Sequence, residues 1–266
     1  MSDHKPHYKR PPIVERVVSV RAEIDRETYD RGFDEWQGWV QKEFPVDEPV
    51  KNWHVNIQRR KGIPSDFSSE LEIIPRFSEK SAAQGFGWSI RCPHGQLTMN
   101  MHSNHKDNRT YADLRGRFPS WLEKWIEHFQ VHDFTELTVH YVNRLDHTTL
   151  PSFAREGLLE IDKVLRIFFN ISGKNEVFTP PMDCQVTIKL KGDTEGSLLI
   201  HATDQSSDSF AALTLNLVAT TTLRKGQGTE EILRLMDWCH ERIVERFEMI
   251  FTDEAKLSFE PYGGII

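Results

Sequence analysis

The feature that most constrains the fold is an alternation of apolar and polar residues between positions 13 and 24. Val18, Val20 and Ala22 share one phase, whereas Ser19 and Arg21 share the other. Because successive side chains of a strand point to opposite faces of a sheet, this pattern predicts a strand with one buried side and one solvent-facing side. Sheets that are covered on one side only are typically antiparallel.

The sequence predicts the same order of elements twice. In the first half, the strand at 13–24 is followed by a helix that ends before Pro45, extended runs at 53–58, 71–77, 86–92 and 96–102, and a helix at 118–129. In the second half, a strand at 137–145 is followed by a helix at 158–169, strands at 184–191, 197–203 and 211–223, and a long helix from Thr229. We therefore expect two β-α-β(3-4)-α units.

Two short matches favour an internal duplication. Leu97-Thr-Met-Asn-Met101 resembles Leu213-Thr-Leu-Asn-Leu217, and Arg21-Ala-Glu23 resembles Arg144-Leu-Asp146, at offsets of 116 and 123 residues. A repeat of about 120 residues is expected from matches in the same order. The expected organisation is a flexible arm (1–12), a first repeat (13–132), a second repeat (133–251) and a C-terminal tail (252–266).

These patterns predict the α+β class, with antiparallel sheets, helices on one face and a polar face left open. At the level of element order, this arrangement resembles the saddle of the TATA-binding protein and the helix-grip ligand-binding folds. A shared element order indicates nothing about activity.

Composition excludes several classes of protein. The chain has 33 basic and 40 acidic residues among 266, a net charge of −7, and no apolar run long enough for a membrane helix or a secretory signal, so we expect a cytoplasmic protein. The only basic concentrations are Lys5, Lys9 and Arg10, and the run 59–61, which disfavours nucleic acid. The three cysteines lie far apart, which is typical of reduced thiols.

Two motifs carry a resemblance to a known family. Pro11-Pro-Ile-Val-Glu15 leads into the first strand, and Tyr141-Val-Asn-Arg144 lies in the strand that opens the second half. The chain resembles a sporadically distributed family of uncharacterised bacterial and archaeal proteins of about this length, which carry P-P-I-x-E and Y-x-N-R motifs. The resemblance covers essentially the whole chain and implies no established activity. Patchy distribution is associated with mobile defence or toxin-antitoxin loci.

No motif announces a catalytic, metal or cofactor site. Cys92, His94, His102 and His105 are close in sequence, but their spacing lacks the ligand pairs of zinc sites, which favours structural or solvated histidines. Neither a G-x-S-x-G elbow nor a P-loop is present. We therefore expect no cofactor and assign no catalytic residue; whether the chain is an enzyme stays open.

The polar phase of the strands is the best candidate for a binding surface. Its ligand-binding candidates are Glu15, Arg21, Asn100, His140, Arg144 and Asn216, and Arg21 with Arg144 could clamp a carboxylate or phosphate. The alternative is that each arginine only pairs with an acid. The first hypothesis is a non-enzymatic binding or adaptor protein for a protein or peptide partner, including self-association. The others are a small polar or anionic ligand-binding protein or enzyme with a pocket between sheet and helices, and a nucleic-acid saddle.

Overall fold

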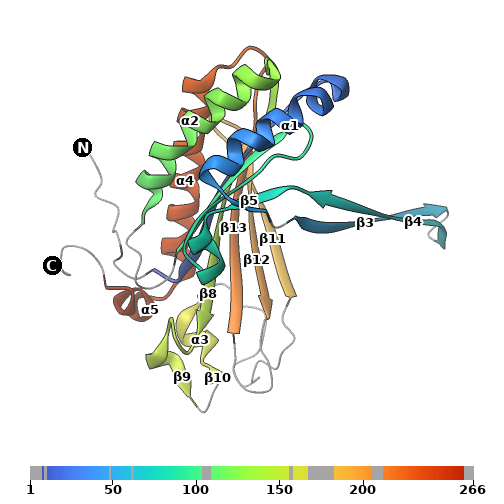
Figure 1. Ribbon diagram of the computed structural model, residues 1–266. Coiled ribbons are helices and arrows are strands. Elements are labelled where there is room, and N and C mark those ends of the chain that lie inside the picture. Colours follow the sequence, from blue (N-terminus) through green and yellow to red (C-terminus); the bar gives the residue numbers. More distant parts are fainter. Residues whose placement is uncertain are drawn as a thin grey trace.

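The α+β class and the antiparallel sheet are confirmed by a computed structural model, which describes residue 8 and residues 11–47, 49–60, 63–103, 109–155, 158–166, 183–204 and 212–260. Nine strands form one sheet (Figure 1). Their spatial order is β11 (Asp183–Leu190), β12 (Gly196–Asp204), β13 (Ala212–Thr222), β8 (Phe134–Asp146), β1 (Ile13–Ala22), β7 (Gln96–His102), β6 (Gly87–Arg91), β5 (Arg76–Ser78) and β2 (Val46–Asp47).

The register of β1 and β8 divides the sheet into two faces. Val18 lies opposite Val139, and Val20 lies opposite Leu137, so the buried phases of the two strands coincide. We call the side that carries Val18 the apolar face. The other side, which carries Glu15, Ser19 and Arg21 and the positions paired with them, is the polar face. Alternation in β1 was therefore read in the correct phase.

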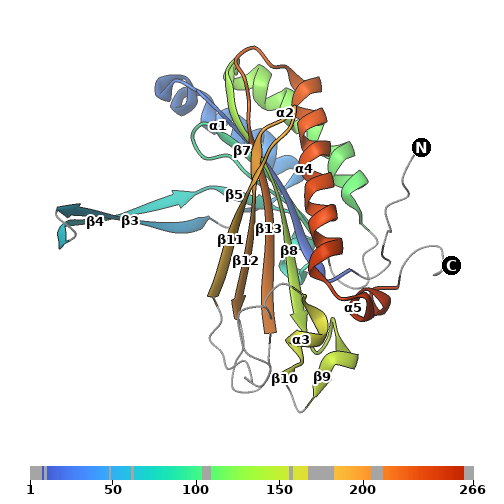
Figure 2. The same ribbon diagram turned by 180° about the vertical axis from the view of Figure 1, so that it is seen from behind.

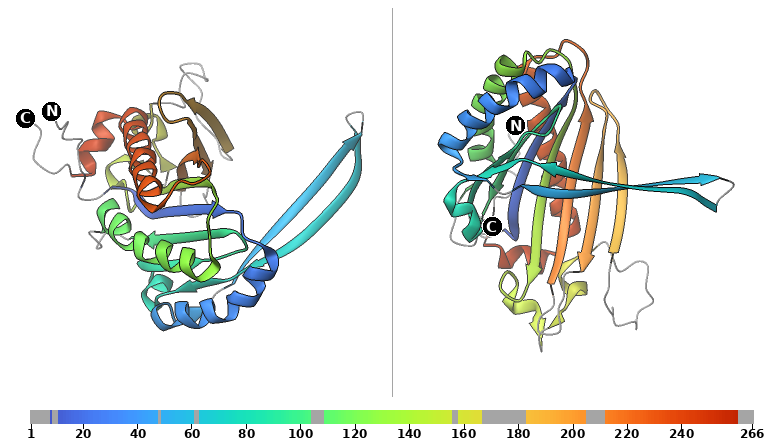
Figure 3. Two further views of the ribbon diagram at one scale, coloured as in Figure 1. Left: turned by 90° about the horizontal axis from the view of Figure 1, so that it is seen from above. Right: turned by 45° about the vertical axis from the view of Figure 1, so that its right-hand side comes forward.

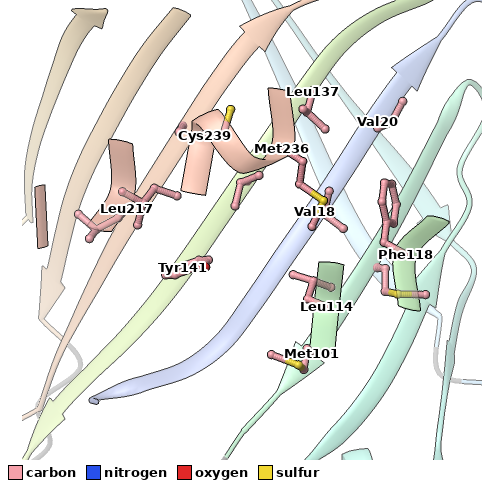
Figure 4. Close-up of a cluster of buried hydrophobic side chains, with 14 of the residues drawn as sticks. Val18, Val20, Met101, Leu114, Phe118, Leu137, Tyr141, Leu217, Met236 and Cys239 are labelled. Carbon is pink, nitrogen blue, oxygen red and sulfur yellow. The ribbon is translucent and has the colours of Figure 1, made fainter. Parts of the chain in front are cut away.

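Two helices cover the apolar face. α2 (Tyr111–Phe129) contacts β7 and β1, and α4 (Thr229–Ile250) contacts β13 and β8 (Figure 3). Figure 4 shows Met236 and Cys239 of α4 and Leu114 of α2 among buried side chains of the strands. The predicted stripe of α4 is buried throughout: Ile232, Leu235, Met236, Cys239, Ile243, Phe247 and Ile250. Burial of these side chains drives the packing of helices on the sheet.

Helix α1 (Arg26–Glu43) packs against α2 through aromatic rings. The Trp36 and Trp121 rings meet edge to face with centroids 5.9 Å apart, and both are buried. α1 begins at Asp25, whose carboxylate accepts a hydrogen bond from the Thr28 backbone N–H at 2.9 Å. This start precedes the apolar stripe from which the helix was predicted, and the buried Tyr29 extends that stripe into the first turn.

A long two-stranded ribbon departs from the predicted sheet. β3 (Val50–Arg60) and β4 (Ile63–Ile74) form a two-stranded sheet of their own and project away from the body of the molecule (Figures 1 and 2). The sequence predicted strands at 53–58 and 71–77 but not their separation from the sheet. Strand signals predict an extended backbone and leave the choice of partner strand open.

Several short elements correct the predicted boundaries. The helix expected at 158–169 is only α3 (Ile161–Val164), preceded by the hairpin of β9 (Ala154–Arg155) and β10 (Leu158–Leu159), and residues 167–169 lie outside the described part of the chain. The expected C-terminal tail contains α5 (Asp253–Ser258) and a buried Phe259. η1 (Lys80–Gln84) and η2 (Pro151–Phe153) are single turns of 3-10 helix.

The expected flexible arm contains one docked residue. Tyr8 donates a hydrogen bond from its hydroxyl to Glu248 at 2.9 Å, and its ring contacts those of Phe247 and Phe259. Burial and the neighbouring carboxylate raise the pKa of Tyr8. The residues on either side of it, 1–7 and 9–10, lie outside the described part.

The two sequence matches that suggested a duplication fall in different registers. Asn100 lies opposite Val17 of β1, and Asn216 lies opposite Val142 of β8, which relates the opening strands by an offset of 125 residues. The match of Arg21 with Arg144 requires an offset of 123. The two matches therefore cannot both mark equivalent positions.

No helix in the described ranges combines the length and the apolar character that crossing a bilayer requires.

We predict that Leu114→Ala destabilises the protein by about 2–5 kcal/mol, because this fully buried side chain of α2 would leave a cavity over the sheet. Glu123→Ala, at an exposed position of the same helix, should change stability by less than about 0.5 kcal/mol. Urea unfolding followed by circular dichroism measures both. Equal midpoints for the two variants would contradict the burial of this stripe.

Candidate functional site

A row of hydroxyl groups crosses the centre of the polar face. The registers place Thr98 and Thr138 on either side of Ser19, with Thr220 beyond Thr138. Ser19 Oγ lies 2.9 Å from Thr98 Oγ1, and Thr138 Oγ1 lies 3.1 Å from Thr220 Oγ1. Gln96 donates from Nε2 to Ser19 Oγ at 2.8 Å. These bonds satisfy the hydroxyls mutually and hold the row in place.

A cluster around Glu15 lies beside this row. The Glu15 carboxylate accepts a short hydrogen bond from Asn100 Nδ2 and lies 3.6 Å from His102 Nδ1. The other ring nitrogen of His102, Nε2, lies 3.2 Å from Ser89 Oγ. Asn100 is 7% exposed, and its Oδ1 has no hydrogen-bond partner. Glu15 and Asn100, both predicted as binding residues, are therefore brought together.

Burial determines the charge of His102. Loss of hydration is the largest effect on its pKa and lowers it; nearby Arg76 and Arg91 lower it further, whereas Glu15 opposes them. The ring is therefore neutral above its lowered pKa. In that state one nitrogen donates and the other accepts, which fits a position between a hydroxyl and a carboxylate.

His140 and Asn216 form a second pair on the same face. His140 Nε2 lies 2.9 Å from Asn216 Oδ1, across the boundary between β8 and β13. Burial lowers the pKa of His140, while the hydrogen bond with Asn216 and the charge of Glu15 partly oppose this. The ring therefore donates its Nε2 proton to the amide oxygen in its neutral form. These two predicted residues are also brought together.

The predicted clamp of Arg21 and Arg144 is wrong. Arg21 lies opposite Glu136 at one end of β8, and Arg144 lies eight positions further along that strand, about 26 Å away. Arg144 donates from Nε to the buried carboxylate of Asp146 at 2.7 Å. Arg21 donates to Gln96 at 3.2 Å and lies 3.8 Å from Glu136. Each arginine thus has a local partner.

The Y-x-N-R motif is divided between the two faces. Tyr141 and Asn143 point to the apolar face and are buried beneath α4, whereas Arg144 lies on the polar face. The Tyr141 hydroxyl lies 2.7 Å from His240 Nδ1, and Asn143 donates to the Leu215 carbonyl oxygen at 3.0 Å. Tyr141 therefore holds α4, and Asn143 holds β13, against β8.

Residues of the P-P-I-x-E motif line a pocket at the start of β1. It measures about 470 Å³ and is bounded by Pro12, Glu15, His102, Arg144 and Asp146, among others. Carboxylate, imidazole and guanidinium groups thus meet at one opening, where β1 begins and β7 and β8 end. The two motifs, more than 100 residues apart in sequence, contribute to the same wall.

Ser89, His102 and Glu15 form a row of contacts in which an imidazole lies between a hydroxyl and a carboxylate. Sequence reasoning missed this arrangement. Each residue lies on a different strand, and only the registers of β6, β7 and β1 bring them into line. Alternation within each strand could have placed them on one face, but not beside one another. Ser89 is fully buried, so its hydroxyl orients His102 rather than facing a substrate.

The residues considered for a metal lie apart. Cys92 is buried, and burial raises the pKa of its thiol. His94 Nε2 lies 2.8 Å from the Ile24 carbonyl oxygen, His102 is held in the Glu15 cluster, and His105 is outside the described residues. Within the described ranges, no group of three or more His, Cys, Asp or Glu side chains is arranged to hold a metal ion.

A large cavity borders the polar face at the end of β1. It measures about 900 Å³, within the range of small-molecule sites, and its walls include Arg21, Arg91, Gln96, Thr98 and Thr135. Arg91 was not singled out from the sequence. Its phase in β6 could have placed it on the polar face, whereas its position beside this cavity depends on the tertiary fold.

Comparison with known proteins identifies no relative: no family model matches the chain, and neither the curated proteins nor the solved structures include a match. The resemblance based on the two motifs therefore stays a prediction.

We predict that stability falls as the pH drops below about 6.5, the ordinary pKa of histidine in the unfolded chain, because the folded protein holds His140 at a lowered pKa and the unfolded chain takes up the proton first. His140→Gln, which keeps a donor for Asn216, should weaken this dependence. Urea midpoints at pH 7.5 and 5.5 measure it. The assignment fails if the variant loses as much stability on acidification as the wild-type protein.

Proposed function

We propose that this chain is a non-enzymatic binding or adaptor protein that recognises a protein or peptide partner through its polar face. The observation that carries the proposal is the extent and chemistry of this face. Donors and acceptors such as Gln96, Thr138, His140 and Asn216 extend over four adjacent strands. They present no patch of a single charge sign.

The size of the sheet favours a macromolecular partner. Polar-phase side chains are partly or fully exposed along four adjacent strands, β11, β12, β13 and β8, whereas Thr98, Asn100 and Ser89 of β7 and β6 are buried. A small ligand would cover only a few of these strands. The position of α2 and α4 supports the assignment, because these two helices pack against the other face.

Three half-buried aliphatic residues lie within the polar surroundings. Val142 lies opposite Asn216, Val218 lies opposite His140, and Leu199 lies opposite Val218. Protein interfaces commonly place apolar contacts at the centre of a patch and polar contacts around it. We infer that these three side chains form the centre of the contact.

We further propose that the surface joins two halves of common origin. The strand order supports this: β13, β12 and β11 follow β8 on one side, and β7, β6 and β5 follow β1 on the other. An offset of 125 residues, taken from the positions opposite Asn100 and Asn216, is the relation consistent with this order. The likeness to the TATA-binding protein saddle or to helix-grip folds stays a prediction.

Nucleic acid is the less favoured partner. Acidic groups at Glu15, Glu136 and Asp183 lie on the same face as the arginines, and a phosphate backbone is normally met by a continuous basic surface. The basic residues Lys5, Lys9 and Arg10 lie outside the described part of the chain. Location in the cytoplasm and a mobile defence-type locus likewise stay predictions.

We predict that Val218→Lys abolishes co-purification of a stoichiometric partner from cells of the source organism, because it places a charge at the centre of the contact. Met249→Lys is the matched control: it replaces an exposed apolar residue on the outer side of α4 and should retain the partner. Affinity purification, mass spectrometry and binding of the recombinant partner test this.

Thermal unfolding of both variants shows whether they fold. The proposal is wrong if folded Val218→Lys binds the recombinant partner as tightly as the control, or if no stoichiometric protein is retained by the wild-type chain. Steeply salt-dependent retention of the wild-type chain on heparin would favour the nucleic-acid saddle instead.

A further inference from the structure

Two arginines lie directly opposite each other on the polar face. Arg76 of β5 and Arg91 of β6 are cross-strand partners, and Thr98 of β7 is the next residue in the same row. Like charges directly opposite each other in a sheet are destabilising. In line with this, the charge of Arg76 lowers the pKa of Arg91, although loss of hydration is the larger cause.

Arg91 lacks the partners that a desolvated guanidinium requires. Its Nε is buried without a hydrogen-bond partner, and among the described residues the side chain makes no ion pair. Buried charges are normally paired, because burying an uncompensated charge is destabilising. The arrangement therefore costs stability unless a bound group supplies the missing acceptor.

The acid that acts on Arg91 is already engaged. Among the described residues, Glu15 is the carboxylate whose charge raises the pKa of Arg91, and it accepts the short hydrogen bond from Asn100 and lies beside His102. It occupies the row of His102, whereas Arg91 lies in the row of Thr98. Four residues along β7 separate the two rows, so Glu15 acts on Arg91 through space and leaves its N–H donors open.

A ligand can reach Arg91 through the cavity of about 900 Å³. Thr98 and Gln96, which also line it, supply neutral polar groups beside the guanidinium. The acids of the cavity lie at its other end: Glu23 is four positions beyond Ser19 along the chain, about 13 Å from the row of Arg91. Two of them are engaged, Asp25 with the first turn of α1 and Asp133 with Lys225 at 2.9 Å.

We propose that Arg91, with Arg76 beside it, forms a subsite for an oxyanion, the carboxylate or phosphate group of a ligand that enters the cavity. Guanidinium groups bind such oxygens in bidentate fashion, and the bound anion offsets the repulsion between the two arginines. This inference rests on the proposed role of the polar face in binding. It specifies that the ligand carries a carboxylate or phosphate group.

Thermal unfolding of the full chain with inorganic phosphate or succinate, each at an ionic strength matched with NaCl, tests the subsite. The wild-type protein should show a saturable rise in Tm of about 3 °C at ten times the dissociation constant of the effective anion. Arg91→Met should abolish this rise. Without anion its Tm should equal or exceed that of the wild type, because the substitution removes the buried Nε that has no hydrogen-bond partner.

Arg246→Met is the matched control, since Arg246 lies on α4, which packs on the apolar face, and should leave the rise unchanged. A response to phosphate alone identifies a phosphate site, and a response to succinate alone a carboxylate site. The inference is overturned if neither anion acts beyond NaCl, or if Arg91→Met responds like the wild type. Because no partner protein is present, these results are independent of partner capture.

Discussion

The antiparallel pairing of β1 with β8 is the interaction on which the rest of the structure depends. It joins segments about 120 residues apart and lies at the centre of the nine-stranded sheet. The remaining seven strands of this sheet flank the pair on its two sides. Its register brings the apolar phases of both strands to one side, where α2 and α4 cover them. A slip of one residue would turn Val18 and Val20 to the polar face.

Patterns within single elements were predictable from the sequence. The buried stripe of α4 and the phase of β1 follow from the periodicity of their apolar residues. Boundaries and partners were less predictable: the sequence predicts a helix from Leu158, yet Leu158 and Leu159 form a short hairpin with Ala154 and Arg155. A few apolar residues in a row fit both a helix and a strand, and the choice depends on contacts with distant parts of the chain.

The candidate site shows the same division. The placement of Glu15, Asn100, His140 and Asn216 on the polar face follows from alternation, whereas their neighbours follow from register. Arg21 and Arg144 illustrate the difference. Both lie near the C-terminal ends of their strands, and because the strands are antiparallel neighbours, similar positions in the two strands are at opposite ends of the sheet. Because Arg21 and Arg144 occupy similar positions in two antiparallel strands, they lie too far apart to clamp one ligand.

A binding surface on a sheet must reconcile two demands. Hydroxyls and amides such as Ser19, Thr98 and Gln96 satisfy one another and make the surface rigid, but groups that are fully satisfied have little to offer a ligand. Groups of this face that are buried without a hydrogen-bond partner among the described residues include Ser78 Oγ, Asn100 Oδ1 and Nε of Arg91. They cost stability in the unbound protein, and a ligand that supplies an acceptor for Arg91 recovers that cost. Unsatisfied groups within an otherwise satisfied face therefore indicate where binding energy is available.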